Sequence, residues 1–464
     1  MKRVEEIVKI VSPKKVEGPV TSVVSHITAD SRTVQEGSLF ICLVGATVDG
    51  HIFVNKAIED GAVAIIASKP VIVPDNVTVL YVDDTRQALQ DAVPFFYDYP
   101  ASKMRMIGVT GTNGKTTTTH IIGHMLRSQG YTVGIIGTVH ILIDDQSYPI
   151  HNTTPDVADL QQILQQMVDA GVTHCIMEVS SHALALGRTA GVEYDTAVFT
   201  NLTQDHLDFH KTFDNYLAAK SKLFKQVSAS YQMKEGKGTM NASELAITAK
   251  SSKFNLSYDG KNYSISTKIA GMFNVYNTLA AVGAALYEGL TMEEIVSALT
   301  TFTAVPGRFE LIEEGQDFAV VVDYAHTPDG LENILQTAKK IVDNRILVVF
   351  GCGGDRDATK RPIMGRIAAQ FGDRVFVTSD NPRTEDPIQI VKDVEVGVKE
   401  GLHDAVTYEV IVDRREAIHK AIGEATTGDV VIIAGKGHED YQILKDETIH
   451  FDDREVAREA LKEK

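Results

Sequence analysis

Residues 104–120 read MRMIGVTGTNGKTTTTH, and this stretch decides the fold class. The run MRMIGVT is apolar like a buried strand, a glycine-rich turn follows it, and the residues after the turn have the pattern of a helix. Such a turn lets backbone N–H groups at a helix N-terminus approach phosphate oxygens. Lys115 would add a point charge for the β- and γ-phosphates, and the Thr116 hydroxyl could ligate Mg²⁺. We therefore expect an ATP or GTP site here, against the alternative of an ordinary glycine turn.

The turn departs from the strict G-x-x-x-x-G-K-[ST] pattern, because Val109 stands where the first glycine is required. Strand, loop, Lys-Thr pair and helix nevertheless occur in the expected order. The loop alone does not say what the phosphate is used for. The residues expected to surround it are Gly111, Thr112, Asn113, Gly114, Lys115, Thr116 and Thr117.

The same order of apolar strand, glycine-containing turn and helix recurs along the chain. It is found again at 173–187, 346–357 and 430–442. Strands that alternate with helices predict parallel sheets covered by helices, so we expect an α/β fold.

Two interruptions divide the chain. Pro100 follows an aromatic segment and precedes a new apolar strand, and Pro306-Gly307 breaks a helical pattern. At ~150 residues per domain, the 464 residues are enough for about three domains. We expect these domains at 1–100, 101–305 and 306–464.

The composition excludes several function classes. Lys and Arg number 45 against 62 Asp and Glu, and the net charge of −17 disfavours nucleic acid and anionic membranes as partners. The three cysteines, Cys42, Cys175 and Cys352, lie far apart, which favours a reducing compartment. No run approaches the ~18 apolar residues that span a bilayer, and the N-terminal MKRVEEIVKI has no signal-peptide core. We expect a cytoplasmic, monomeric protein that acts on small molecules.

Carboxylates and imidazoles gather after two further strands. Glu178 ends an apolar strand, where open α/β sheets bind ligands, and could hold Mg²⁺ opposite Thr116. The alternative for Glu178 is a charge at a helix N-terminus. Segment 201–210, NLTQDHLDFH, places two His and two Asp within six residues, a density that packing does not explain. Lys220 follows on a helix, where periodicity alone favours an exposed surface charge.

Together with these segments, further motifs occur in the order of the Mur ligases, and the resemblance covers nearly the whole chain. The motifs are GTNGKTT, NTTP at 152–155, EVSSHAL, NLTQDHLDFH with Lys220, GMFNVYN at 271–277, PGRFE, DYAHTP, GGDRD, DNPR and GKGHE. The chain most resembles the branch that adds the third amino acid to UDP-N-acetylmuramoyl-L-alanyl-D-glutamate. The resemblance implies three domains: an N-terminal UDP-binding domain, a central P-loop ATPase domain with a parallel sheet, and a Rossmann-like C-terminal domain.

The resemblance also implies a reaction. ATP would phosphorylate the D-glutamyl carboxylate, and the incoming amine would attack the acyl phosphate through a tetrahedral intermediate. Positioning and neutralisation of the phosphate charge would drive the first step. Lys220 matches the lysine that family members carbamylate, which converts a cation into an anionic oxygen ligand. The implied Mg²⁺ ligands are Thr116, Glu178, His206 and Lys220, and the catalytic set adds Lys115 to the last three.

For the nucleotide sugar, Ser31 matches the family's uridine-site serine. The positions that hold the muramoyl dipeptide are matched by Asn152, Thr153, Thr154, Ser180 and Arg188. The alternative for the Thr153-Thr154 pair is a simple turn closed by its own hydroxyl groups.

For the adenine side, Asn274 and Asn277 lie one helical turn apart and could present amides to a base edge. Asn274 could equally be a helix N-cap. Arg308 and Asp323 resemble the C-terminal residues that close over the phosphates and the ribose of ATP.

The added amino acid is indicated by Asp380-Asn381-Pro382-Arg383, which is similar to the motif of enzymes that add meso-diaminopimelate rather than lysine. Diaminopimelate carries a distal carboxylate that lysine lacks, and an Arg fork binds a carboxylate bidentately. Arg356, Gly435 and Glu439 match the rest of that pocket, with Glu439 expected to meet the distal ammonium. The alternative is a turn in which Arg383 is solvated.

One region departs from the family pattern. Only 51 positions separate Lys220 from Gly271, and QVSASYQMKEGKGTM at 226–240 replaces a strand that usually continues the central sheet. Residues 244–266 alternate like a β-hairpin or meander. Ala46 stands where some relatives have a polar residue near the uracil. Two other functions therefore stay open: a paralogue that joins another amino acid or acceptor, and a catalytically weak nucleotide-sugar-binding protein.

Overall fold

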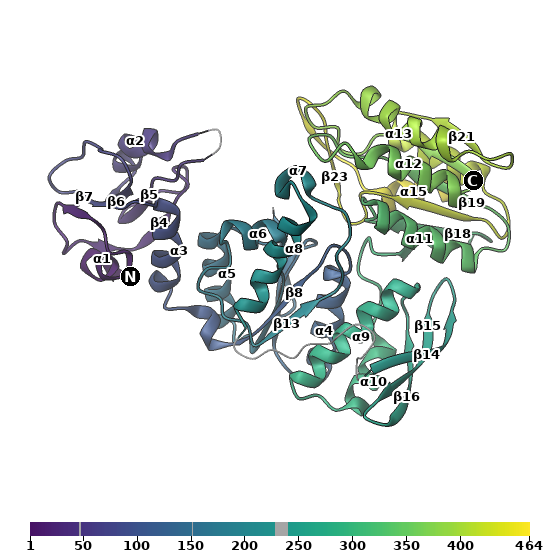
Figure 1. Cartoon of the computed structure of the whole chain (residues 1–464), viewed down its shortest axis with the longest axis horizontal. Coiled ribbons are helices and arrows are strands. Elements are labelled where there is room, and N and C mark those ends of the chain that lie inside the picture. Colours follow the sequence, from purple (N-terminus) through teal and green to yellow (C-terminus); the bar gives the residue numbers. More distant parts are fainter. Residues whose placement is uncertain (46–47, 151, 228–239) are drawn as a thin grey trace. The chain divides into compact units, whose positions relative to one another are not determined.

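The computed structural model describes residues 1–45, 48–150, 152–227 and 240–464 (Figure 1). Its contacts divide the chain into two units, each built from separate stretches of sequence. Unit 1 comprises Met1–Gly108, Tyr131–Ala197 and Lys222–Ser230, and unit 2 comprises Val109–Gly130, Val198–Ser221 and Tyr231–Lys464. Ala46 and most of the 226–240 segment lie outside the described residues.

The N-terminal part of unit 1 is a five-stranded sheet with the order β2-β7-β6-β5-β4, parallel except for β2. The central strands read AVAIIA and SLFI and are buried, because apolar side chains cover both sheet faces. The strands are β2 (Lys15–Glu17), β4 (His26–Thr28), β5 (Ser38–Ile41), β6 (Ala62–Ala67) and β7 (Thr78–Tyr81), with the short pair β1 (Lys2–Arg3) and β3 (Val23–Val24). The helices are α1 (Val4–Val11), η1 (Gly50–Phe53), α2 (Val54–Glu59), α3 (Thr85–Phe96) and η2 (Pro100–Lys103).

The central sheet has the order β11-β10-β9-β12-β8-β13. Its core strands are parallel, as β9 and β12 show, whereas β10 and β11 form an antiparallel hairpin at one edge. The strands are β8 (Arg105–Thr110), β9 (Val133–Ile136), β10 (Ile141–Ile143), β11 (Gln146–Tyr148), β12 (His174–Glu178) and β13 (Thr196–Phe199). The helices are α4 (Lys115–Ser128), α5 (Val157–Asp169), α6 (Ser181–Leu186), α7 (Leu207–His210), α8 (Phe213–Ser221) and η3 (Lys222–Lys225).

Within the described residues, β13 is the outermost strand on its side of this sheet. Beyond it, Val227 makes a single isolated bridge to Tyr194, and the Tyr194 amide donates to the Gln226 carbonyl at 2.8 Å. The strand that the family pattern places here is therefore reduced to one bridge in the part of the segment that the structure describes.

Unit 2 contains an antiparallel meander of β14 (Met240–Ile247), β15 (Ser252–Tyr258) and β16 (Lys261–Thr267), which confirms the hairpin or meander expected at 244–266. Helix α10 (Met292–Thr301) packs on β16, and both α9 (Met272–Tyr287) and α10 pack on α4. The helix that begins at the phosphate loop is thus supported along its length.

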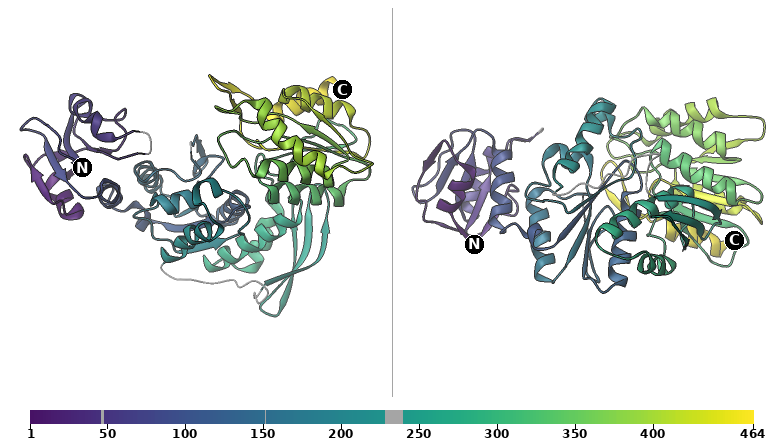
Figure 2. Two further views of the ribbon diagram at one scale, coloured as in Figure 1. Left: turned by 45° about the horizontal axis from the view of Figure 1, so that its top comes forward. Right: turned by 60° about the horizontal axis from the view of Figure 1, so that its bottom comes forward.

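The C-terminal part of unit 2 is a six-stranded sheet with the order β17-β18-β22-β19-β20-β21, parallel except for β17. Figures 1 and 2 show helices packed on this sheet. Helices α11, α12 and α13 cover one face, and α14 and α15 cover the other. The strands are β17 (Glu310–Leu311), β18 (Ala319–Asp323), β19 (Ile346–Phe350), β20 (Arg374–Val377), β21 (Thr407–Val410), β22 (Val430–Ala434), β23 (Tyr441–Ile443) and β24 (Thr448–His450). The helices are α11 (Pro328–Ile341), α12 (Lys360–Phe371), α13 (Pro387–Gly401), α14 (Arg414–Glu424) and α15 (Asp453–Glu463).

This topology confirms the α/β prediction and places the candidate residues. In a parallel sheet the carboxyl ends of the strands share one edge, and ligands bind there. Asp323 ends β18, Gly435 follows β22, and Asp380 lies in the loop after β20. Residues that are far apart in the sequence therefore meet at one edge.

Candidate active site

The phosphate loop between β8 and α4 requires its glycines. Gly114 has a φ of +85°, and a Cβ at this position would lie 2.2 Å from Asn277 Oδ1. A Cβ on Gly111 would lie 1.9 Å from Thr200 Oγ1. Only glycine avoids both the backbone strain and the steric contact, so the loop can pass close to its neighbours.

The loop is held in place by the segment that follows β13. The Asn113 amide donates to Asn201 Oδ1 at 2.9 Å, and Thr200 Oγ1 donates to the Asn113 carbonyl at 2.6 Å. Thr112 N donates to the Asn201 carbonyl at 3.0 Å. These hydrogen bonds hold the loop from the side of the segment after β13 and so preorganise it.

Two cations accompany the loop. Lys115 Nζ donates to the carbonyls of Gly111 at 3.0 Å and Thr112 at 2.8 Å. Arg308 Nη2 donates to Thr116 Oγ1 at 2.9 Å, and its guanidinium lies 4.4 Å from the centre of the Tyr324 ring. A glycine loop at a helix N-terminus with an ammonium and a guanidinium beside it is suited to a polyphosphate.

Lys220 is buried rather than exposed, so the surface charge favoured by periodicity alone is wrong. Its side chain is 1% exposed, Nζ donates to the Gly111 carbonyl at 2.7 Å, and the ammonium lies 4.5 Å from the centre of the Tyr216 ring. Burial and the nearby Lys115 lower the pKa of Lys220 to about 6, although Asp205 opposes them. The amine is therefore uncharged at neutral pH and able to react as a nucleophile.

His206 contacts Asp205, the carboxylate whose charge acts on Lys220. His206 Nε2 is 3.2 Å from Asp205 Oδ2, and the imidazole is partly exposed. Burial would raise the pKa of the Asp205 carboxyl, but His206, His326 and Lys360 beside it hold that pKa below its usual value. Asp205 thus stays ionised and orients the imidazole, whose ring also lies against Tyr216.

The two asparagines of α9 are buried under the phosphate loop. Asn274 Nδ2 donates to the Ala270 carbonyl at 2.7 Å, and Asn277 Nδ2 donates to Asn274 Oδ1 at 3.1 Å. The N-cap of α9 is Gly271, so the alternative of Asn274 as the N-cap is wrong. In this structure both side-chain amides are bonded within the protein, and Asn277 Oδ1 packs closely against Gly114.

Two further carboxylates of unit 2 are Asp323, at the end of β18, and Asp329, in the first turn of α11. Asp323 accepts hydrogen bonds from the amides of Phe309 at 2.6 Å and Ala325 at 2.8 Å. Burial raises the pKa of Asp323 to about 6, against the opposing charge of Arg308. Asp329 Oδ2 accepts from Asn113 Nδ2 at 2.6 Å, a contact that sequence reasoning missed because it joins residues 216 positions apart.

In unit 1, Glu178 ends β12 with its carboxylate fully buried. Oε1 accepts from the Thr138 amide at 2.8 Å and Oε2 from the Thr138 hydroxyl at 3.0 Å. Ser180 is the N-cap of α6 and accepts from the Ala183 amide, so the first turn of that helix does not use Glu178. The alternative role of Glu178 as a helix N-terminal charge is therefore wrong.

The predicted dipeptide-site residues gather around the same strand end. Thr154 Oγ1 donates to the Glu178 carbonyl at 2.8 Å and accepts from the Ser180 amide at 3.0 Å. The hydroxyl thus bonds across 24 and 26 positions, not within a local turn. Arg188 Nη1 donates to the Thr154 carbonyl at 3.2 Å, and Thr153 Oγ1 lies 3.1 Å from Thr138 Oγ1. Asn152 is exposed beside them, and Ser31 is half-buried in the loop after β4.

The pocket motifs of the C-terminal part also meet. Arg383 has a φ of +53°, and its Nη1 donates to the carbonyls of Gly354 at 2.8 Å and Asn381 at 3.4 Å. The motif does form a turn, in which the Glu385 amide donates to the Pro382 carbonyl. Arg383 is nevertheless half-buried and bonded, so the solvated side chain of that alternative is wrong.

Opposite this turn, Asn381 Nδ2 donates to Glu439 Oε2 at 2.8 Å. A Cβ on Gly435 would lie 2.6 Å from Asp380 Oδ2, so this glycine lets the two loops approach. Arg356 is exposed, with Nη1 on the Asp355 carbonyl at 2.9 Å. These residues line one edge of the sheet with carboxylates and guanidinium groups together, which suits a ligand that carries both charges.

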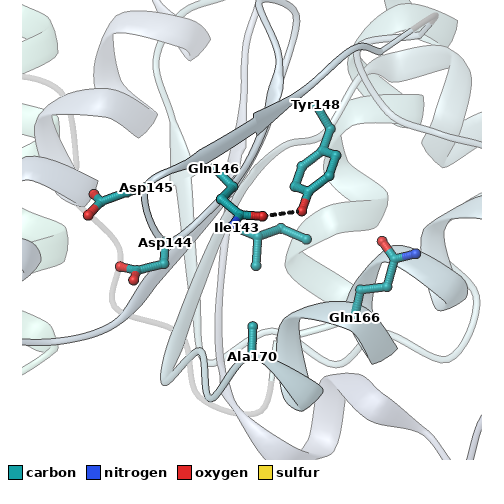
Figure 3. A pocket seen from close by; sticks show the side chains of 7 residues that line it. All are labelled: Ile143, Asp144, Asp145, Gln146, Tyr148, Gln166 and Ala170. Carbon is teal, nitrogen blue, oxygen red and sulfur yellow. Dashed lines mark hydrogen bonds between the residues drawn. The ribbon is translucent and has the colours of Figure 1, made fainter.

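Elsewhere in unit 1, a cavity of about 380 Å³ lies beside the β10–β11 hairpin (Figure 3). It is lined by Ile143, Asp144, Asp145, Gln146, Tyr148, Gln166 and Ala170, and it contains none of the predicted site residues. Within the described part of the chain, no three His, Cys, Asp or Glu side chains form a metal cluster, and no helix is long and apolar enough to cross a membrane.

Family models match three consecutive stretches of the chain. The match at 23–97 is to the Mur ligase family, catalytic domain, and that at 109–233 and 227–285 is to the Mur ligase middle domain. Residues 307–437 match the Mur ligase, glutamate ligase domain.

Whole-chain relatives agree. The chain is 49% identical to the UDP-N-acetylmuramoyl-L-alanyl-D-glutamate–2,6-diaminopimelate ligase of Geobacillus thermodenitrificans over 94% of both chains, and 43% identical to ligase 1 of that name from Clostridium acetobutylicum over 98% and 99%. A solved structure of a ligase with this name superposes with a TM-score of 0.68 and 32% identity over 100% and 99% of the chains. The MurF ligase from Thermotoga maritima in complex with ADP shares the fold, with a TM-score of 0.64 at 17% identity over 95% and 96%. The phosphate loop, the three matched stretches and these relatives together show that the chain belongs to the Mur ligase family, with its three-domain α/β architecture.

Proposed function

We propose that the chain is an ATP-dependent ligase that joins meso-diaminopimelate to UDP-N-acetylmuramoyl-L-alanyl-D-glutamate in peptidoglycan precursor synthesis. The observation that carries the proposal is the 49% identity to a diaminopimelate-adding relative across 94% of both chains. In the reaction, the D-glutamyl carboxylate takes the γ-phosphoryl group and ADP leaves. The amine then attacks the acyl carbon, phosphate leaves, and an amide remains.

Residues of unit 2 would bind ATP. Residues 111–117 would cradle the phosphates, with Lys115 and Arg308 neutralising their charge. Asp323 is a carboxyl placed to accept from a ribose hydroxyl, and Asn274 and Asn277 would form the floor of the adenine side. An anchored loop costs little reorganisation when the phosphoryl group moves, which favours transfer.

The metal donors in our proposal are Thr116, Glu178, His206 and a carbamylated Lys220. Hydroxyl, carboxylate and carbamate oxygens are ligands that Mg²⁺ prefers, and phosphate oxygens would complete the shell. When bound, Mg²⁺ would offset the negative charge of the transferring phosphoryl group. The uncharged Lys220 amine can take up CO₂ as a carbamate, so the low pKa supports this assignment.

Residues of unit 1 would bind the acceptor, and residues of the C-terminal part of unit 2 would bind the added amino acid. Ser31 would hold the uridine, and the residues around Thr154 and Arg188 would hold the muramoyl dipeptide. Asp380, Asn381, Pro382, Arg383, Arg356, Gly435 and Glu439 would bind diaminopimelate. Two charged hydrogen bonds from Arg383 to the distal carboxylate would be worth on the order of 10²- to 10⁴-fold preference over lysine.

The test is direct. The purified chain is incubated with ATP, Mg²⁺ and the UDP-muramoyl dipeptide, with meso-diaminopimelate or L-lysine in parallel, and phosphate release and product mass are followed. We expect a tripeptide product with diaminopimelate alone. A product with another amino acid would instead identify a paralogue of different specificity. Nucleotide binding without any product would identify a catalytically weak binding protein.

Three simpler expectations belong to the same proposal. The domain limits at 1–100, 101–305 and 306–464, a monomeric state and a cytoplasmic location all fit a ligase of small soluble substrates. Light scattering of the purified chain tests the monomer.

A further inference from the structure

Lys436 is a buried lysine next to the proposed amino-acid-binding residues, and the proposed reaction gives it no role. It lies between Gly435 and Gly437, directly after β22, and its side chain is 0% exposed. Nζ lies 3.1 Å from Glu439 Oε2 and 3.4 Å from Asn381 Oδ1, and 5.4 Å from the centre of the Tyr441 ring. Burying an ammonium costs free energy unless it is paired, so we ask what the buried Lys436 contributes to the site.

The bonds to Glu439 are asymmetric. Asn381 Nδ2 at 2.8 Å and Lys436 Nζ at 3.1 Å both donate to Oε2. Among the described residues, none donates to Oε1, although the side chain is only 13% exposed. One carboxylate oxygen is therefore fixed by the protein, and the other is left for a donor that comes from outside.

The charge balance around Glu439 depends on the lysine. Burial and the neighbouring Asp380 raise the pKa of Glu439, whereas Lys436 and the Asn381 amide lower it. The titratable and charged groups that face Glu439 are Asp380 from the loop after β20, Lys436 from the loop after β22, Tyr441 from β23, Arg414 from α14 and Tyr324 from the loop after β18. Of these cations, Lys436 alone bonds directly to the carboxylate within the described residues.

We propose that Lys436 is a positioning residue for amino-acid selection: it holds Glu439 by Oε2 and keeps Oε1 aimed at the distal ammonium of the incoming amino acid. The inference rests on the proposed function, which supplies that ammonium. Lys436 itself does not touch the substrate, because its side chain is fully buried. It acts through Glu439, and its loss is felt as weaker binding of the amino acid and not of ATP.

The experiment compares Lys436→Met with the wild type and with Lys445→Met, which makes the same change at an exposed site in the adjoining β23–β24 turn. We expect Lys436→Met to raise the KM for diaminopimelate about tenfold or more, with the KM for ATP unchanged. The acid limb of kcat/KM for diaminopimelate should also move to higher pH, because Glu439 would protonate more readily. Lys445→Met should alter neither.

A double-mutant cycle separates positioning from mere folding. In a Glu439→Gln background, Lys436→Met should raise the KM for diaminopimelate little further, because both substitutions remove the same interaction with the distal ammonium. Additive losses together with an unmoved acid limb would overturn the proposal. If Lys436→Met does not fold, Lys436→Gln is used, judged by the same acid limb. If the wild type forms no diaminopimelate product, the proposed function and this inference are both overturned. If the wild type is active and the Lys436 variants keep its KM for diaminopimelate and its pH profile, only the inference is overturned.

Discussion

Burial decides what Lys220 can do. With a pKa lowered to about 6, its uncharged fraction at pH 7.5 exceeds that of an exposed lysine by roughly a thousandfold. We expect Lys220→Ala to reduce turnover by about 10³-fold or more, with partial rescue by small carboxylates that replace the carbamate. Bicarbonate depletion should lower wild-type activity, and recovery should be faster at pH 8 than at pH 5.5, because the amine is protonated below its pKa.

The matched control for this prediction is Lys225→Ala, since Lys225 is exposed and lies five positions further along the chain. The turnover of the wild type, Lys220→Ala and Lys225→Ala is measured by phosphate release. Full activity in Lys220→Ala would contradict the carbamate assignment, and equal losses in both variants would point to a general effect of charge.

Arg383 should control affinity for the amino acid. Its guanidinium is fixed by the Gly354 and Asn381 carbonyls, so it is presented to a ligand at little entropic cost. We expect Arg383→Ala to raise the KM for diaminopimelate about 10- to 100-fold, as one or two charged hydrogen bonds would require. The KM for ATP should not change. Arg366→Ala, which removes an exposed arginine from α12, is the control, and an unchanged KM for diaminopimelate in Arg383→Ala would refute the pocket.

The residues of the site were predictable from the sequence, but their burial was not. GTNGKTT is predicted from residue type and order, and DNPR from its resemblance to the motif of diaminopimelate-adding enzymes. Lys220 resembles a surface lysine by periodicity, whereas in the structure its side chain is buried and bonded to the Gly111 carbonyl, 109 positions away. Lys436 stands in the GKGHE motif, three positions before Glu439, but neither its burial nor its contact with Asn381, 55 positions away, can be read from that motif.

At the scale of elements, the N-terminal end of α11 contacts the phosphate loop through the Asn113 side chain. Asp329, in the first turn of α11, accepts from Asn113 Nδ2 at 2.6 Å. Removing the Asp329 carboxylate takes away the shortest hydrogen bond of the Asn113 side chain. We expect Asp329→Ala to raise the KM for ATP several-fold, about 3 to 10 times, as the loss of one charged hydrogen bond would. Glu332→Ala, one turn further along α11, should not. An equal change in both variants would show that helix charge, and not this contact, matters.

Helices α14 and α15 are joined by a buried ion pair and by an exposed one, which gives an internal comparison. Arg414 and Asp453 are both fully buried and 2.7 Å apart. Arg414→Met would leave a buried carboxylate unpaired and should cost about 3–5 kcal/mol of unfolding free energy. Arg415→Met, which breaks the exposed pair with Glu459, should cost less than about 1 kcal/mol.

Chemical denaturation measures both variants, and replacing Arg414 and Asp453 together by Met and Leu should recover most of the loss. A small cost for Arg414→Met alone would mean that water reaches the pair.

The elements themselves followed from local patterns more readily than their order did. Strand, turn and helix at 104–120 and the meander at 244–266 are set by neighbouring residues. The order β17-β18-β22-β19-β20-β21 is set by contacts between distant strands, for which the sequence carries no local signal.

For the whole molecule, linear domains and packed units differ. The predicted domain limits at 100 and 305 are boundaries along the sequence, whereas contacts group residues 109–130 and 198–221 with the C-terminal region in unit 2. Pro and Gly mark where an element is interrupted, whereas a unit is defined by what its surfaces contact. The phosphate-loop residues therefore belong to unit 2, and Glu178 with the dipeptide-site residues belongs to unit 1.

This division predicts which amides each substrate protects from hydrogen exchange. A non-hydrolysable ATP analogue without Mg²⁺ should slow exchange in 111–117 and 323–329 of unit 2, because only loop and cation contacts are then available. The UDP-muramoyl dipeptide alone should slow exchange in 152–156 and 178–188 of unit 1. Adding Mg²⁺ to the nucleotide should extend its protection to 178–180, since Glu178 would then ligate the metal. Equal protection of that segment by nucleotide with and without Mg²⁺ would remove Glu178 from the metal site.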